Sequence, residues 1–120
     1  MAIKDYTLKD ISGFGQYGKT ITYSGLAISD QGAPLEAFGY ADRSVQVDGV
    51  FGSGGSVMIE GSNNGSTYYP LTDPQGNNLE ITSGKIEQIS EAVVYLRPRV
   101  TSGDGSTSIN VTILMRKGNH

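Results

Sequence analysis

Carboxylates are the residues of this chain that could do chemistry, because the side chains that accompany them in most hydrolases are missing. The sequence has 12 Asp and Glu residues and no cysteine, and its single histidine, His120, is the last residue. Ordering is least expected at a terminus, so His120 is a poor general base for a nucleophilic triad. A glycosidase would need two acids roughly 5 to 10 Å apart across a cleft. Because the acids are spread along the chain, we interpret them as solvated charges and predict no enzymatic activity.

Loop residues offer two further ligand classes, phosphate and calcium. The glycine-rich run Gly52–Ser56 lacks the Lys-Ser/Thr of a phosphate-binding loop and precedes a strand, so it predicts a hairpin turn. Loop oxygens that could bind calcium occur at Asn63, Asn64, Asp73 and Asp104. These positions lack the dense spacing of a dedicated calcium loop, and turn chemistry explains them equally well. We therefore expect no cofactor and no bound metal.

Arginines near the end of the chain are the most informative charged residues. Arg97, Arg99 and Arg116 fall on the outward faces of the last two predicted strands, which we expect to pair in a hairpin. Tyr95 and Leu114 accompany them there. A basic patch on a chain of net charge −3 can recognise an acidic partner surface through planar guanidinium groups. The same residues also suit an ordinary solvated sheet face.

Nucleic acid and membranes are poor candidate partners for this chain. A net charge of −3 lacks the general basic footprint of a nucleic-acid binder, and one aromatic residue among the arginines is too few for a single-strand groove. No stretch approaches the roughly 18 apolar residues that cross a bilayer. The sequence predicts a protein made without a secretory signal, with no direct contact to nucleic acid or membrane.

The elements that position these side chains are predicted to be short β-strands. Residues 107–116 alternate between apolar and polar, and the apolar set is Ile109, Val111, Ile113 and Met115. Similar alternation predicts strands at 44–51 and from Val57 onward. Seventeen glycines interrupt the chain, and no window of a dozen residues keeps an unbroken helical pattern. We expect an all-β antiparallel β-sandwich of seven or eight strands with jelly-roll-like connectivity.

Turn residues divide the predicted strands. Asn63-Asn64-Gly65 predicts a second hairpin, and Gly103-Asp104-Gly105 separates the last two strands. Pro98 lies inside the strand before that turn and lacks a backbone donor, which suggests an edge strand or a bulge.

Three segments make up the predicted organisation. Residues 1–19 carry apolar side chains without periodicity and are expected to form an irregular arm. Residues 20–117 form the sandwich, and residues 118–120 are a C-terminal tail. If the arm grips a partner, the apolar residues that would contact it include Tyr6, Leu8 and Phe14.

Four segments together resemble small structural proteins of tailed bacteriophages that are encoded near the major capsid protein. They are Val45–Gly52, Val57–Gly76, Leu96–Gly105 and Val111–Arg116. The resemblance is a pattern of turn and strand residues and covers roughly residues 45–116. Similar turns occur in other viral and carbohydrate-binding sandwiches.

The resemblance implies a capsid decoration or cement protein with no catalytic activity. Such a protein sits on the outer surface of the virion capsid and bridges major capsid protein subunits, after being made in the cytoplasm of the host bacterium. The resemblance also implies a homo-oligomer, with a dimer favoured over a trimer. An alternative stays open, a carbohydrate-binding or tail- or fibre-associated sandwich module. The chain has no Trp, and adjacent Tyr68 and Tyr69 would point to opposite faces of a strand, which weakens that alternative.

Overall fold

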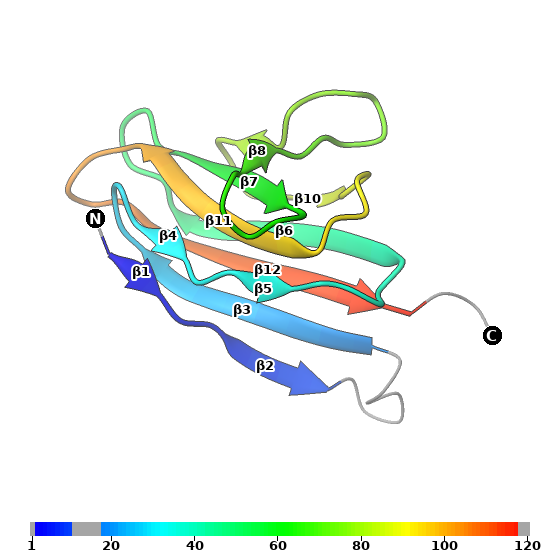
Figure 1. The fold of residues 1–120 in the computed structure, drawn as a ribbon. Helices are drawn as coiled ribbons and strands as arrows, with labels where there is room; N and C mark the ends of the chain where they lie inside the picture. Colours follow the sequence, from blue (N-terminus) through cyan, green and yellow to red (C-terminus); the bar gives the residue numbers. More distant parts are fainter. Residues whose placement is uncertain (1, 11–17, 118–120) are drawn as a thin grey trace.

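The computed structural model describes residues 2–10 and 18–117, and these form two packed β-sheets (Figure 1). The predicted all-β sandwich is confirmed. The strand order does not demonstrate a jelly-roll connectivity, which stays a prediction. Within the same residues, no helix has the length and apolarity to cross a membrane.

The larger sheet has seven strands, and five of them follow the order β1-β4-β11-β7-β8. The other two lie off this path, where β5 pairs with β11 and β9 pairs with β7. The strands are β1 (Ile3–Lys4), β4 (Gln31–Gly32), β5 (Leu35–Glu36), β7 (Ser56–Ser62), β8 (Tyr69–Pro70), β9 (Glu80–Ile81) and β11 (Tyr95–Ser102). Long strands β7 and β11 pair antiparallel at its centre.

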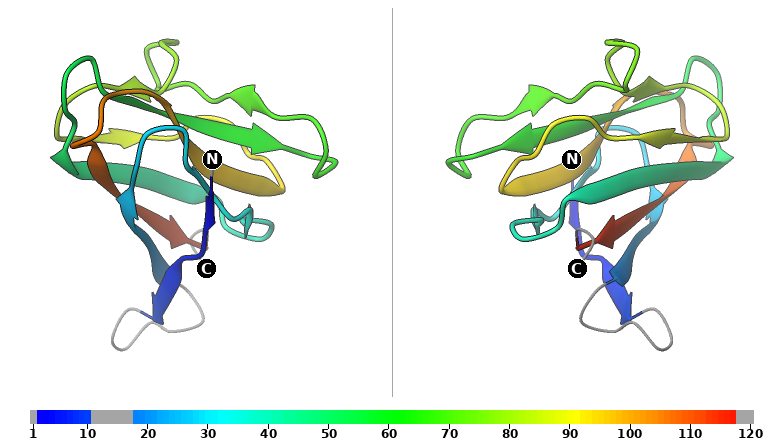
Figure 2. Two further views of the ribbon diagram at one scale, coloured as in Figure 1. Left: turned by 90° about the vertical axis from the view of Figure 1, so that its left-hand side faces the viewer. Right: turned by 90° about the vertical axis from the view of Figure 1, so that its right-hand side faces the viewer.

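The smaller sheet has five strands in the order β10-β6-β12-β3-β2. They are β2 (Thr7–Asp10), β3 (Gly18–Leu26), β6 (Asp42–Val50), β10 (Lys85–Gln88) and β12 (Ser108–Arg116). All of its pairings are antiparallel. Figure 2 shows the two sheets facing each other end-on.

The core lies between the sheets, where the apolar members of each alternating strand meet. The apolar set expected for β12 is at most 1% exposed, as are Val45 and Val47 of β6 and Val57 and Ile59 of β7. The period of two therefore placed these side chains on the correct face. Tyr23 of β3 is fully buried among them, and its hydroxyl donates to the Ala33 carbonyl at 2.7 Å.

Two turns that were expected to close hairpins instead carry the chain from one sheet to the other. Residues 51–55 join β6 of the smaller sheet to β7 of the larger one, and residues 103–107 join β11 to β12 in the same way. The two hairpin predictions at these turns are wrong. The turn after β7 does lead into an antiparallel partner, since Gly61 pairs with Tyr69 of β8.

The segment expected to be an irregular arm is paired with both sheets over residues 2–10. β1 pairs in parallel with β4, and the Ala2 amide donates to buried Asp30 at 3.1 Å. β2 then pairs with β3, which begins at Gly18, before the expected boundary at residue 20. Sequence periodicity missed these strands because both are short. Residues 11–17 and 118–120 lie outside the described residues.

Pro98 does not lie on an edge strand, because β11 has partners on both sides. β4 and β5 pair with β11 on either side of Pro98, so its missing backbone donor faces the break between two short strands. The bulge in the pairing of β11 with β7 lies further along, between Val100 and Ser102. A Cβ at Gly32 would lie 2.6 Å from the Pro98 ring and 2.4 Å from Tyr23, so this close approach requires glycine.

Candidate binding surfaces

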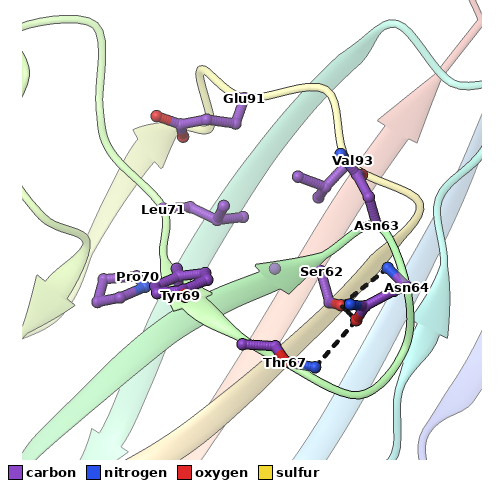
Figure 3. Close-up of a pocket in the computed structure, with 10 residues that line it drawn as sticks. Ser62, Asn63, Asn64, Thr67, Tyr69, Pro70, Leu71, Glu91 and Val93 are labelled. Atoms are coloured by element: carbon purple, nitrogen blue, oxygen red, sulfur yellow. Dashed lines mark hydrogen bonds between the residues drawn. The ribbon is translucent and has the colours of Figure 1, made fainter.

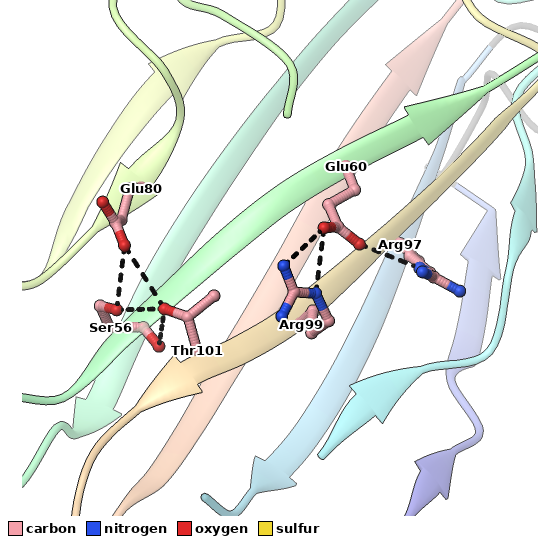
Figure 4. A network of polar contacts seen from close by, with 6 residues as sticks. All are labelled: Ser56, Glu60, Glu80, Arg97, Arg99 and Thr101. Atoms are coloured by element: carbon pink, nitrogen blue, oxygen red, sulfur yellow. Dashed lines mark hydrogen bonds and ion pairs between the residues drawn. The ribbon is translucent and has the colours of Figure 1, made fainter. Parts of the chain in front are cut away.

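Two of the predicted contact residues, Arg97 and Arg99, belong to an ion cluster on the outer face of the larger sheet (Figure 4). Both bond Glu60 of neighbouring β7. Arg97 Nε lies 3.1 Å from Glu60 Oε1, and Arg99 donates to Oε2 through Nε at 3.0 Å and through a terminal nitrogen at 2.9 Å. Register explains the contact, because Glu60 lies directly opposite Arg97.

An aromatic ring further restrains this cluster. The Arg97 guanidinium lies 3.8 Å from the centre of the Tyr68 ring, a cation–π arrangement. The Glu60 side chain is only 6% exposed, whereas the Arg99 side chain is 41% exposed. The predicted basic patch is therefore mostly a neutralised structural cluster, and Arg99 is its accessible cation.

The remaining candidates from the last two strands do not all join this cluster. Tyr95 lies on β11 beside Ser62 of β7 and is half-buried. Leu114 and Arg116 lie on β12 in the other sheet, where Arg116 bonds Asp42 at 2.8 Å. The expectation of one continuous patch on paired strands is wrong, because β11 and β12 belong to different sheets.

The candidates from the N-terminal segment separate in the same way. Tyr6 packs edge-on against Tyr23, with ring centres 5.4 Å apart and an interplanar angle of 68°, so it helps to close the core. Leu8 lies at the edge of the smaller sheet opposite Ile21 and is 51% exposed. Phe14 lies outside the described residues.

A shallow pocket of about 560 Å³ lies at one end of the sandwich, between the β7–β8 loop and the segment before β11 (Figure 3). Its wall combines the ring of Tyr69, 68% exposed, with polar side chains of Asn63, Asn64 and Glu91. Most of these polar groups already serve the fold. Asn64 Oδ1 accepts from the Ser66 and Thr67 amides, and Asn63 Oδ1 accepts from the Val94 amide. What is left for a ligand is mainly the Tyr69 ring.

Glu91 is the acidic residue that lines this pocket, and its carboxylate is bound to Thr72. One oxygen accepts from the Thr72 amide at 2.7 Å, and the other accepts from the Thr72 hydroxyl. Burial raises the pKa of Glu91, but these hydrogen bonds outweigh it, so the pKa lies below its ordinary value. An anionic Glu91 with both oxygens bound is not a proton donor for catalysis at neutral pH.

A second pocket of about 480 Å³ adjoins the first, and Asn63 and Val93 line both. Phe38, with 78% of its surface exposed, stands at this pocket, together with half-buried Tyr40 and buried Arg43. Sequence reasoning singled out neither Phe38 nor Arg43. A signal for Arg43 was present, because Arg43, Val45 and Val47 follow one another at intervals of two residues and so share one face of the strand.

The loop oxygens considered for calcium serve turns instead. Asp73 Oδ1 accepts from the Gln75 and Asn77 amides at 3.0 Å each. Asp104 accepts from Ser106 and the Ser53 amide, and these bonds lower its pKa. In the described part of the chain, no three His, Cys, Asp or Glu side chains gather as a metal site would require.

Three comparisons with known proteins found no match. No family model matches the chain, and neither a curated protein nor a solved structure matches it.

Proposed function

We propose that this protein is a non-enzymatic structural protein of a tailed-bacteriophage virion. It binds the outer surface of the capsid and stabilises the shell by bridging major capsid protein subunits. Its synthesis takes place in the cytoplasm of the host bacterium, and it acts as a homo-oligomer, with a dimer favoured over a trimer. The resemblance of residues 45–116 to small structural proteins of such phages supports this function.

The observation that carries the proposal is the exposed aromatic surface at one end of the sandwich. Phe38 is 78% exposed and Tyr69 is 68% exposed, and they belong to two adjoining shallow pockets that share Asn63 and Val93. Exposed aromatic side chains beside shallow pockets are typical anchors of protein–protein contacts. We name the surface formed by these two pockets the end surface.

The outer face of the smaller sheet supports self-association. A row of uncharged side chains crosses all five of its strands: Thr7, Thr22, Thr112, Gln46 and Ile86. Ile86 is 64% exposed, and Leu114 lies in the next row beside Thr20 and Ser44. Lys9 lies opposite Thr20 in that next row and Asp48 lies opposite Asn110 on the other side, so a contact between two copies that is centred on the uncharged row has charged side chains at its rim.

Mass action is the mechanism by which such a protein would act. A ligand that binds only the assembled shell stabilises that shell against disassembly and against the pressure of packaged DNA. A dimer with an end surface on each copy could touch two capsid subunits, so that two weak contacts act together. Neither step needs a catalytic group.

The experiment is quantitative mass spectrometry of purified phage particles that encode this chain, taken as its copy number relative to the major capsid protein. We expect a simple fraction of the capsid copy number. A few copies per particle would place the protein in the tail or at one vertex, and its absence from particles would overturn the proposal.

A variant links that measurement to the end surface. Replacing both Phe38 and Tyr69 with Ser should reduce the copy number on particles, because it removes the aromatic anchors. Ile3→Ser on β1 is the control, since Ile3 is 62% exposed and lies on neither the end surface nor the outer face of the smaller sheet. Equal copy numbers for the two variants would show that the end surface does not hold the capsid.

A carbohydrate-binding or fibre-associated module is the second candidate, favoured by the exposed Tyr69 ring beside Asn63 and Asn64. Tyr68 does not join it in a platform, because its ring stacks on Arg97. Binding to a glycan array that is lost in Tyr69→Ala, with no capsid association, would favour this candidate.

A further inference from the structure

Arg43 is a buried cation at the end of the sandwich. It lies on the core-facing side of β6, in line with Val45 and Val47, and is 5% exposed. Its terminal nitrogens donate to two backbone carbonyls, Glu91 O at 2.8 Å and Ala37 O at 3.1 Å. Arg43 Nε is also buried and has no hydrogen-bond partner among the described residues.

No Asp or Glu side chain compensates this charge. The described residues include every Asp and Glu of the chain, and none of them forms an ion pair with Arg43. The nearby Glu91 contributes only its carbonyl oxygen, since its carboxylate is bound to Thr72. Burial lowers the pKa of Arg43, but a guanidinium stays protonated, so the site holds an uncompensated positive charge. Buried charges are ordinarily paired because removing them from water is costly.

The pocket beside Arg43 suits an anion that carries some apolar surface. Apart from Arg43, its lining contains no charged residue: Phe38, Gly39, Tyr40, Ala41, Asn63, Ala92, Val93 and Val94. Its volume of about 480 Å³ is enough for a side chain of a partner. Attraction between Arg43 and a carboxylate in this pocket is stronger than in bulk water, because the surrounding protein has a low dielectric constant.

We propose that this pocket is a carboxylate-recognition site that receives an acidic side chain of a partner protein. The partner's Asp or Glu enters the pocket lined by Arg43, and its aliphatic stem packs on the exposed Phe38 ring. The occupant supplies the negative charge that the fold lacks. This inference applies to a capsid partner but does not require one, so it can fail while the proposed function holds.

The first test is a titration of the isolated, ¹⁵N-labelled protein with two peptides that differ in one charge. Acetyl-Gly-Glu-Gly-amide is the probe, and acetyl-Gly-Gln-Gly-amide is its control. We expect the Glu peptide to shift the Arg43 Nε–H and Phe38 amide resonances and to bind at least about fivefold more tightly than the Gln peptide, with the difference reduced by salt. Equal binding of both peptides, or no shift from either, would overturn the proposal.

The second test supplies the carboxylate from the chain itself. Ala92 is exposed and lines the pocket, so Ala92→Glu can be accommodated and Ala92→Gln is its matched control. We expect Ala92→Glu to raise the melting temperature above that of Ala92→Gln and to abolish binding of the Glu peptide. An Ala92→Glu variant that is less stable than Ala92→Gln would contradict a site built for a negative charge.

Discussion

Glu60 and Arg43 are both buried charged residues, but only Glu60 has oppositely charged partners. Glu60 lies on the outer face of the larger sheet and bonds two arginines, Arg97 and Arg99. Arg43 faces the core from the smaller sheet and has two carbonyl oxygens but no carboxylate. Glu60 has both of its cationic partners within the described residues, whereas Arg43 has no Asp or Glu partner among them. A buried charge whose counterions lie in the same chain indicates a structural role. A buried charge that lacks a counterion and lies beside a pocket indicates a binding partner.

Removing the charge of Glu60 should have the largest effect. Glu60→Gln leaves two arginines without their shared carboxylate, and breaking a buried ion pair costs about 3 kcal/mol of unfolding free energy. Urea denaturation measures it. The control is Glu36→Gln on β5, where the residue is exposed. A loss of less than about 0.5 kcal/mol, the range of ordinary surface changes, would remove the contrast with Arg43.

Glu91 tests whether Arg43 has a hidden counterion. Glu91→Gln should cost about 1.5 kcal/mol at neutral pH, because the hydrogen bonds from Thr72 lose an ionised acceptor. The pKa of Glu91 is lowered by folding, so its contribution is present above the ordinary value of 4.5 and is lost as the pH falls through the lower folded-state value. Denaturation curves of both proteins between neutral and acidic pH should therefore converge. If the Arg43 Nε–H resonance moved with this titration, Glu91 would be its counterion.

Replacing Arg43 should change stability less than replacing Glu60. Arg43→Met removes two hydrogen bonds but also an uncompensated buried charge, so we expect a net change within about 1 kcal/mol. Arg43→Lys keeps the charge and loses the guanidinium geometry, and it should be the less stable of the two variants. The opposite order in urea denaturation would show that the carbonyl bonds of Arg43 are its main role.

The smallest loss of stability is expected for the exposed ion pair of Arg116 and Asp42. Their side chains are 66% and 49% exposed, so Arg116→Gln should cost no more than about 0.5 kcal/mol. High salt should remove this difference from wild type. A larger, salt-insensitive loss in denaturation experiments would mean that the two residues contact something else in the folded protein.

The sequence predicted which side chains of a strand face the core and where the strands end. Alternation along 107–116 identified the buried side chains of β12, and glycine-rich turns identified where strands end. Which strands pair could not be predicted in the same way. A turn such as 52–55 can have the same residues whether the two strands that it joins pair with each other or belong to different sheets. This is why Arg97 and Arg116 were expected on one surface and lie on two.

The candidate sites were less predictable, for physical reasons that differ between residues. The burial of Glu60 depends on Arg97, Arg99 and the Tyr68 ring, and no local pattern links those positions. Arg43 shares the alternation of the buried valines, so its inward direction was readable, but its lack of a counterion depends on every other carboxylate in the fold. Phe38 precedes a glycine in a loop, where periodicity says nothing about exposure.

The last two strands of the chain each occupy the middle of a sheet. β11 lies between β7 and the short strands β4 and β5, and β12 lies between β6 and β3 (Figure 1). A ribosome that has made the first ninety or so residues has therefore produced two sets of strands with no central partner. Neither sheet can be completed before β11 and β12 have both been made, so the two sheets should form together in one cooperative step. Early termination of translation would leave unpaired strand edges, which favour aggregation over a partly folded protein.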